Sequence, residues 1–326
     1  MNTVSVHSYS PLNWSQIAPL VESWPFKPVS RLVVASQAGL IQSTCTEVRT
    51  SMGDKESISC VAMQGREARG FAGFKILSWD SEQLGIAAAR VDYLVATGAY
   101  EQQRLIKDKL LESVLGVARD RGIWHLSARV DASDLSSLHA YEEAGFITVD
   151  GILTFACELS AAHSSPAATD FAIRLATAAD ADATGELARN AYEFDRFHAD
   201  PFINPHRADE LHATWLQNSC KGLAADAVLV AEDEAGLLGF VTCARNRNSG
   251  KVNDSDGTIV LVATAARARG RGVGRAMTMA ALEWFRDQGC THVEVGTQIR
   301  NIAASRLYQD CGFKIVGSAI SLRKLL

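Results

Sequence analysis

The strongest constraint in this sequence is an internal repeat that links its two halves. The segments Asp134–Phe146 and Asn301–Phe313 share one pattern: a polar capping residue, a tyrosine seven positions later, and Gly-Phe starting four positions after the tyrosine. Upstream, the apolar stretches Val91–Ala96 and Thr258–Ala263 lie at matching offsets. Self-similarity at a fixed spacing indicates one structural unit used twice. The chain of 326 residues is long enough for two units of about 150 residues each.

The boundary between the two halves is predicted at residues 160–170. This segment is small and polar and contains a proline, and it has no hydrophobic periodicity, as is typical of a linker. The predicted domains are therefore 1–159 and 171–326.

Hydrophobic periodicity in the second half predicts alternating helices and strands. The expected helices are 179–191, 209–219, 274–288 and one that opens at Asn301, and the expected strands are 227–231, 237–243, 258–264 and 292–297. With a last strand after the final helix, the order is α-α-β-β-β-α-β-α-β. This order predicts an α/β fold in which a mixed sheet is flanked by helices.

A glycine-rich turn lies between the predicted strand 258–264 and the helix that follows it. Glycines at positions 270, 272 and 274 let the backbone turn sharply and place no Cβ between it and a ligand. The N-terminus of the new helix favours negative charge, so a diphosphate suits this place. Arg267, Arg269, Arg271 and Arg275 add cations that suit phosphate. Taken alone, the turn is equally compatible with a tight connection, and it has neither Walker A nor GxGxxG spacing.

Together with the downstream segment, the turn resembles a known family. Residues 269–274, Arg-Gly-Arg-Gly-Val-Gly, resemble the Arg/Gln-x-x-Gly-x-Gly/Ala signature of the GNAT acetyltransferases, and Asn301–Phe313 resembles the C-terminal motif of that family. The resemblance implies two tandem GNAT-like domains, each a mixed and mostly antiparallel sheet flanked by helices. It also implies that the second half moves an acetyl group from acetyl-CoA to a primary amine.

The resemblance further implies roles for individual residues. The pyrophosphate of acetyl-CoA is expected on the turn, its pantetheine arm between strands 258–264 and 292–297, and its thioester oxygen near a backbone N–H of Ala263 or Thr264. The expected acetyl-CoA contacts are Ala263, Thr264, Arg269, Gly270, Arg271, Gly272, Val273, Gly274, Arg275 and Asn301. Asn301 is first of all a predicted helix N-cap. No metal is expected.

Tyr308 is the general acid that the resemblance implies, because a phenol is protonated at neutral pH and can pass its proton to a departing thiolate. The alternative is a core aromatic on an amphipathic helix. The base is less well defined. The loop 192–207 is rich in aromatic residues, histidines and carboxylates, and His198 and Asp200 are its candidate bases. Each is equally compatible with an ordinary surface loop.

The acceptor is inferred from resemblance alone. Val293–Gln298, the segment Trp215–Asn218 and Leu77–Gly85 are similar to the dTDP-fucosamine acetyltransferase group within the family. This implies a small-molecule amine acceptor, the 4-amino group of a dTDP-linked aminodeoxy sugar. Two alternatives stay open: a peptide or protein N-terminal acetyltransferase, and a non-catalytic acyl-CoA sensor.

The first half is predicted to be a degenerate copy. Gln103, Leu105 and Lys107 stand at the offset of the three glycines, and their side chains are expected to fill the space that a diphosphate needs. Tyr141 is therefore expected to pack rather than to react.

The composition of the chain narrows the choice of binding partners and of cellular compartment. The net charge of −5 gives no basic footprint for nucleic acid or an anionic membrane. The seven cysteines are scattered and form no CxxC pair, as is typical of reduced thiols. The N-terminal residues lack the pattern of a secretory signal, and no apolar run is long enough to span a membrane. A cytoplasmic protein is predicted, with a homodimer as one option for its assembly.

Overall fold

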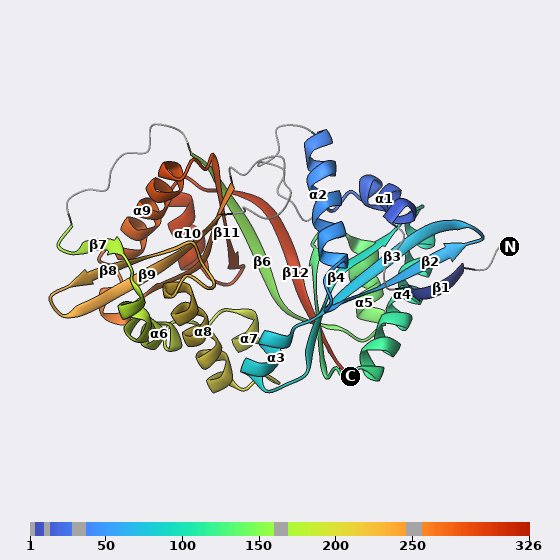
Figure 1. The fold of residues 1–326 in the computed structure, drawn as a ribbon, viewed down its shortest axis with the longest axis horizontal. Coiled ribbons are helices and arrows are strands. Elements are labelled where there is room, and N and C mark those ends of the chain that lie inside the picture. Colours follow the sequence, from blue (N-terminus) through green and yellow to red (C-terminus); the bar gives the residue numbers. More distant parts are fainter. Residues whose placement is uncertain (1–3, 10–13, 28–36, 160–168, 246–255) are drawn as a thin grey trace. The chain divides into compact units, whose positions relative to one another are not determined.

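The computed structural model describes residues 4–9, 14–27, 37–159, 169–245 and 256–326, with elements labelled as in Figure 1. Most of the predicted linker 160–170 lies outside these residues. The described chain divides into two compact units. One holds the described part of Met1–Gly151 together with Ser318–Leu326, and the other holds that of Ile152–Arg247 and Asn253–Gly317.

The first unit contains a sheet in the order β1-β2-β3-β4-β5-β12. Its pairs are antiparallel except β4 with β5, which is parallel. The elements are β1 (Val4–Tyr9), α1 (Trp14–Ser23), α2 (Gln37–Met52), β2 (Ser57–Gln64), β3 (Glu67–Ile76), α3 (Ser78–Leu84), β4 (Ala88–Ala96), α4 (Tyr100–Asp120), β5 (His125–Asp131), α5 (Leu135–Glu143) and β12 (Lys314–Leu325).

The second unit repeats this plan with the sheet order β6-β11-β10-β9-β8-β7. Here β10 and β11 are the parallel pair, and the other pairs are antiparallel. The elements are β6 (Ile147–Glu158), β7 (Ala172–Leu175), α6 (Ala181–Arg189), α7 (Arg196–Ala199), α8 (Pro205–Cys220), β8 (Ala227–Asp233), β9 (Gly236–Arg245), β10 (Asp256–Thr264), α9 (Val273–Asp287), β11 (His292–Gln298) and α10 (Ile302–Asp310), with short 3-10 turns at Ala178–Asp180 and Ala266–Ala268.

These elements confirm the predicted α/β class of mixed, mostly antiparallel sheets, with two differences. The strand β7 and the short helix α7 were not predicted, because four residues carry too little periodicity to be recognised. The last strand, β12, pairs with β5 of the first unit from Ala319↔Asp131 to Leu325↔His125. In return, β6 follows the first unit in sequence and pairs with β11 of the second. The compact units thus differ from the predicted division into 1–159 and 171–326 by an exchange of strands.

The core of the second unit is built on one face of α9. Met277, Ala281 and Phe285 are fully buried against the sheet, and Val273 is 1% exposed. They recur at the spacing of one helical face, as the sequence predicts. Each fully buried large apolar side chain contributes about 1.5–3 kcal/mol to folding, so this face fixes where α9 begins relative to the strands.

Candidate active site

Strands β10 and β11 part at the point where α9 is about to begin. Their parallel pairing runs only as far as Ile259↔Val295, whereas the strands continue to Thr264 and Gln298. The register between β10 and β9 shifts between Ile259 and Val262, which marks a β-bulge. The ladder itself therefore shows that the two strands separate before they end.

The parted strand ends leave backbone donors on the edge of β10 that β11 no longer pairs. Leu261 and Ala265 both donate their N–H groups toward β9, at 2.9 and 2.8 Å. Because successive N–H groups of a strand point to opposite sides, those of Val262 and Thr264 point to the other edge. This places a donor at Thr264, one of the two predicted positions.

The glycine turn has the backbone conformation that the sequence predicts. Gly270 and Gly272 have φ of +80° and +78°, and Gly272 caps the N-terminus of α9. A Cβ at either position meets no heavy atom of the described residues within 4 Å, so they leave the space beside the turn open. Gly274 lies inside the helix, where a Cβ stands 3.4 Å from Thr264 Oγ1. The first N–H groups of α9 have no partner within the helix, as an anion site requires.

The four arginines of the turn divide into two pairs. Arg267 and Arg271 each lie 3.1 Å from the Asp233 carboxylate, and Arg271 also lies 3.0 Å from Asp170. Arg269 and Arg275 are exposed and form no ion pair with the described residues. They are thus the cations still available to a ligand, a distinction that the sequence does not reveal.

Two other predicted contacts have restricted geometry. The Val273 side chain lies in the core, so only its backbone N–H can meet a ligand. Asn301 caps α10, where its side chain accepts a hydrogen bond from the Ala304 N–H at 3.1 Å. Its predicted capping role is confirmed, whereas its contact with acetyl-CoA stays a prediction.

Tyr308 is a core aromatic, and its role as the general acid stays a prediction. Its ring packs in the core, with centroid distances of 5.7 Å to Phe155 and 5.8 Å to Phe313, and the residue is 4% exposed. Its hydroxyl forms no hydrogen bond with any described residue. Burial raises the pKa of the phenol, which keeps it protonated at neutral pH.

The loop 192–207, which the family resemblance places beside the acceptor and which we call the acceptor loop, holds His198 between two carboxylates. Asp195, the N-cap of α7, lies 2.5 Å from His198 Nδ1, and Asp209 lies 3.1 Å from Nε2. The hydrogen bond that His198 donates to Asp195 raises the pKa of His198 above its ordinary value. When the ring is charged, both of its nitrogens are donors and neither offers a lone pair.

Asp200, the other candidate base, is 2% exposed. Its Oδ1 accepts a hydrogen bond from the Phe202 N–H at 3.1 Å, which closes a turn of the loop. The roles of His198 and Asp200 as bases stay predictions.

Two further residues, His212 beside this loop and Tyr192 at its start, were not singled out by the sequence. His212 on α8 is 3% exposed and stacks on the ring of Tyr192 at 4.2 Å. The Tyr192 hydroxyl is buried without a hydrogen-bond partner among the described residues, and burial raises its pKa. The sequence around Tyr192 and His212 contains no motif that marks either residue as functional.

The first unit has no counterpart of the glycine turn. Helix α4 begins at Tyr100, directly after Thr97–Ala99, whereas residues 265–272 separate β10 from α9. The equal-offset comparison of Gln103 and Leu105 with glycines of the turn is therefore wrong, since they lie within a helix. Lys107 is buried there and binds Asp134 at 3.1 Å and the hydroxyls of two serines.

Comparison with known proteins identifies the second unit. Residues 190–313 match the model of the acetyltransferase (GNAT) family. These residues form a GNAT acetyltransferase domain. The chain is 28% identical over 195 residues to the dTDP-fucosamine acetyltransferase of Escherichia coli, covering 60% of this chain and 79% of that protein. It is 25% identical over 236 residues to the spore coat polysaccharide biosynthesis protein SpsD of Bacillus subtilis, covering 72% and 76%.

The tandem arrangement has a precedent among solved structures. A tandem GNAT protein from the clavulanic acid biosynthesis pathway superposes with a TM-score of 0.63 at 13% identity, over 99% of this chain and 98% of that one. At this identity the likeness establishes the fold alone. Among the described residues, no helix has the length and apolarity needed to cross a membrane.

Proposed function

We propose that the second unit transfers an acetyl group from acetyl-CoA to the amino group of a nucleotide-linked aminodeoxy sugar. Acetyl-CoA is the donor that the GNAT family uses. The observation that carries its placement is the coincidence of the parted strands β10 and β11 with the open turn at Gly270 and Gly272. A thioester arm needs a slot lined by backbone donors, and a diphosphate needs bare N–H groups.

Different residues beside this slot are assigned to different steps of the reaction. The N–H of Thr264 polarises the thioester carbonyl, and the acceptor amine attacks its carbon. The C–S bond then breaks, and the sulfur takes the proton of the Tyr308 hydroxyl. The proton released by the amine passes to a base in the acceptor loop, for which His198 and Asp200 are the predicted candidates. Tyr308 suits its role because its hydroxyl is protonated and unbonded within the described chain.

The acceptor class is supported by the relatives. One is named as an acetyltransferase of dTDP-fucosamine and another as a protein of polysaccharide biosynthesis. A dTDP-linked 4-amino-4,6-dideoxy sugar is therefore the acceptor we expect. The aromatic acceptor loop, with Phe194 and Phe202 partly exposed, offers surfaces on which a sugar or base can stack.

The test is release of free thiol from acetyl-CoA by the full chain over a panel of amines. The panel contains dTDP-4-amino-4,6-dideoxy sugars, other aminosugar nucleotides, aminoglycosides, polyamines and short peptides. We expect release with the dTDP-aminosugar, abolished in Tyr308→Phe. Release with peptides alone refutes the sugar acceptor and favours an N-terminal acetyltransferase. Binding of acetyl-CoA without release on any amine refutes catalysis and favours a sensor. Sedimentation of the same sample tests the predicted homodimer.

A further inference from the structure

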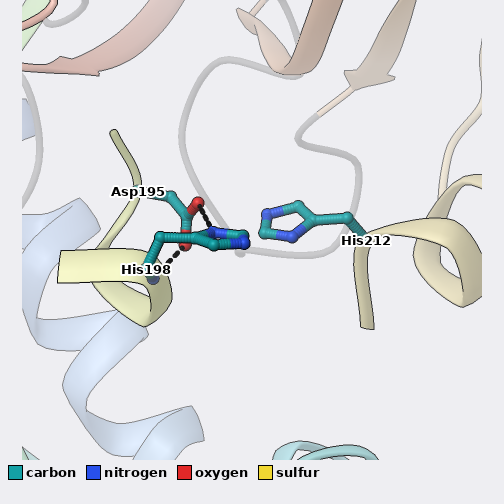
Figure 2. Close-up of side chains that lie close together, drawn as sticks. All are labelled: Asp195, His198 and His212. Carbon is teal, nitrogen blue, oxygen red and sulfur yellow. Dashed lines mark hydrogen bonds and ion pairs between the residues drawn. The ribbon is translucent and has the colours of Figure 1, made fainter. Parts of the chain in front are cut away.

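Three potential metal ligands converge at the acceptor loop. Asp195 and His198 come from the start of α7, and His212 comes from α8 (Figure 2). One donor atom from each side chain lies within 4.8 Å of the donors of the other two. Asp195 and His198 are half-buried, and His212 is 3% exposed. Two imidazoles and one carboxylate are the ligand set of many zinc sites that keep a coordination position open.

The second nitrogen of each imidazole is already held in place. His212 donates its Nδ1–H to the carbonyl of Ala208 at 2.8 Å, and since a carbonyl only accepts, its Nε2 carries the lone pair when the ring is neutral. On His198, Asp209 lies 3.1 Å from Nε2. This leaves Nδ1, which lies 2.5 Å from Asp195, as the nitrogen that can bind a metal. Histidines that bind metals are oriented in this way, by a carbonyl or carboxylate on the nitrogen that does not bind.

Hydrogen bonds within the cluster do not explain why His212 lies beside Asp195 and His198. Among the described residues, no hydrogen bond or ion pair joins its ring to Asp195 or His198, although the rings of the two histidines stack with their centroids 5.8 Å apart. Because His212 donates its Nδ1–H to Ala208, its neutral ring offers only a lone pair at Nε2. Two acceptors, this lone pair and a carboxylate oxygen of Asp195, therefore lie in one cluster. A cation between them satisfies both. Two metal–ligand bonds of about 2.0–2.2 Å nearly span such a separation, and a small closure of the side chains completes it.

We propose that Asp195, His198 and His212 bind one divalent transition-metal ion of the zinc class. The ion joins α7 to α8. It therefore holds the acceptor loop against α8, whose His212 also stacks on Tyr192. At least one coordination position stays open for water or an acceptor group. This site is independent of the acetyl-CoA site, and it departs from the expectation of no metal drawn from the sequence.

The test is equilibrium dialysis of the untagged, chelator-treated full chain against ZnCl2 alone, with the bound metal counted. We expect one equivalent in the parent protein. His212→Gln and Asp195→Asn are expected to weaken binding more than 100-fold, and Asp209→Asn, which removes only the support of His198, 10- to 100-fold. Asn is a good N-cap, so Asp195→Asn keeps the start of α7.

The matched control is His206→Gln. His206 lies on the same helix, with a side chain that is 95% exposed and 4.0 Å from Asp209, and its replacement is expected to leave zinc binding unchanged. Far-UV circular dichroism without metal checks that each variant folds. The proposal is overturned if the parent binds no stoichiometric zinc, or if His212→Gln binds as tightly as the parent, which points to thiols such as Cys220. Neither result bears on the binding of acetyl-CoA at the glycine turn.

Discussion

Replacing Gly270 with alanine separates two reasons for a glycine at this position: the positive φ of the backbone and the space that a ligand needs. The new methyl group meets no heavy atom within 4 Å in the described part of the chain, so it causes no clash there. The φ of +80° still disfavours an L-residue, at a cost of about 1–2 kcal/mol. For a unit of about 150 residues, each kcal/mol lowers the midpoint of thermal unfolding by about 2–4 °C.

Gly289, at the other end of α9, provides the control. It also has φ of +80° and open space around its Cβ position, so Gly289→Ala carries the same backbone strain. Only Gly270→Ala places a methyl group where the diphosphate is expected to approach. We expect the Kd for acetyl-CoA to rise at least 10-fold in Gly270→Ala, which is about 1.4 kcal/mol, and less than twofold in Gly289→Ala.

Isothermal titration with acetyl-CoA, well below both unfolding midpoints, measures the affinities, and calorimetric scans measure the stabilities. The reasoning is refuted if both variants lose affinity equally, because the loss then comes from strain in α9. It is equally refuted if Gly270→Ala binds acetyl-CoA like the parent.

Three further outcomes follow from buried or charged groups. Tyr308→Phe is expected to lower kcat about 10²- to 10⁴-fold while the Kd for acetyl-CoA changes little, and equal losses in both assign the residue to packing. Hydrogen bonds from Arg174 lower the pKa of Asp180, so this pair stabilises the fold above about pH 4 and the contribution is lost as pH falls through the folded pKa. Arg174→Gln is expected to cost about 1 kcal/mol at pH 7 and to flatten stability between pH 4 and 2 in urea titrations, and an unchanged pH slope contradicts this. Lys107→Met is expected to cost about 3 kcal/mol in urea unfolding, because it leaves the buried carboxylate of Asp134 without its cation, and the double variant with Asp134→Asn is expected to recover part of that loss.

The sequence predicts best where a function is encoded by neighbouring residues. The turn at Gly270 and Gly272 was predictable because the backbone conformation needs glycine at those positions. The face of α9 was predictable because Met277, Ala281 and Phe285 repeat with the helical period. Asn301 was predictable as a cap because capping depends on the three residues that follow it.

The sequence predicts poorly where the partner is distant. The convergence of His212 with Asp195 joins positions on two helices, at a spacing that matches no familiar motif. The pairing of Arg271 with Asp170 and Asp233 likewise depends on how strands bring distant carboxylates together. In the first half, equal offsets suggested a filled turn at Gln103, but α4 is longer than α9 at its N-terminus and the turn is absent. The two segments have the same length, so the flanking motifs stay in register while helix replaces the turn between them.

The exchange of strands has a consequence for synthesis. Strand β12 supplies Ser318–Leu326 to the unit that otherwise consists of residues before 152. During translation those earlier residues leave the ribosome first, yet the sheet they build lacks its final strand until everything between has been made. The domain that is translated first is thus completed last, after the acetyltransferase segment has emerged. A nascent first unit therefore waits with the side of β5 that β12 will cover unprotected, and a chain cut between the halves leaves each sheet without a strand.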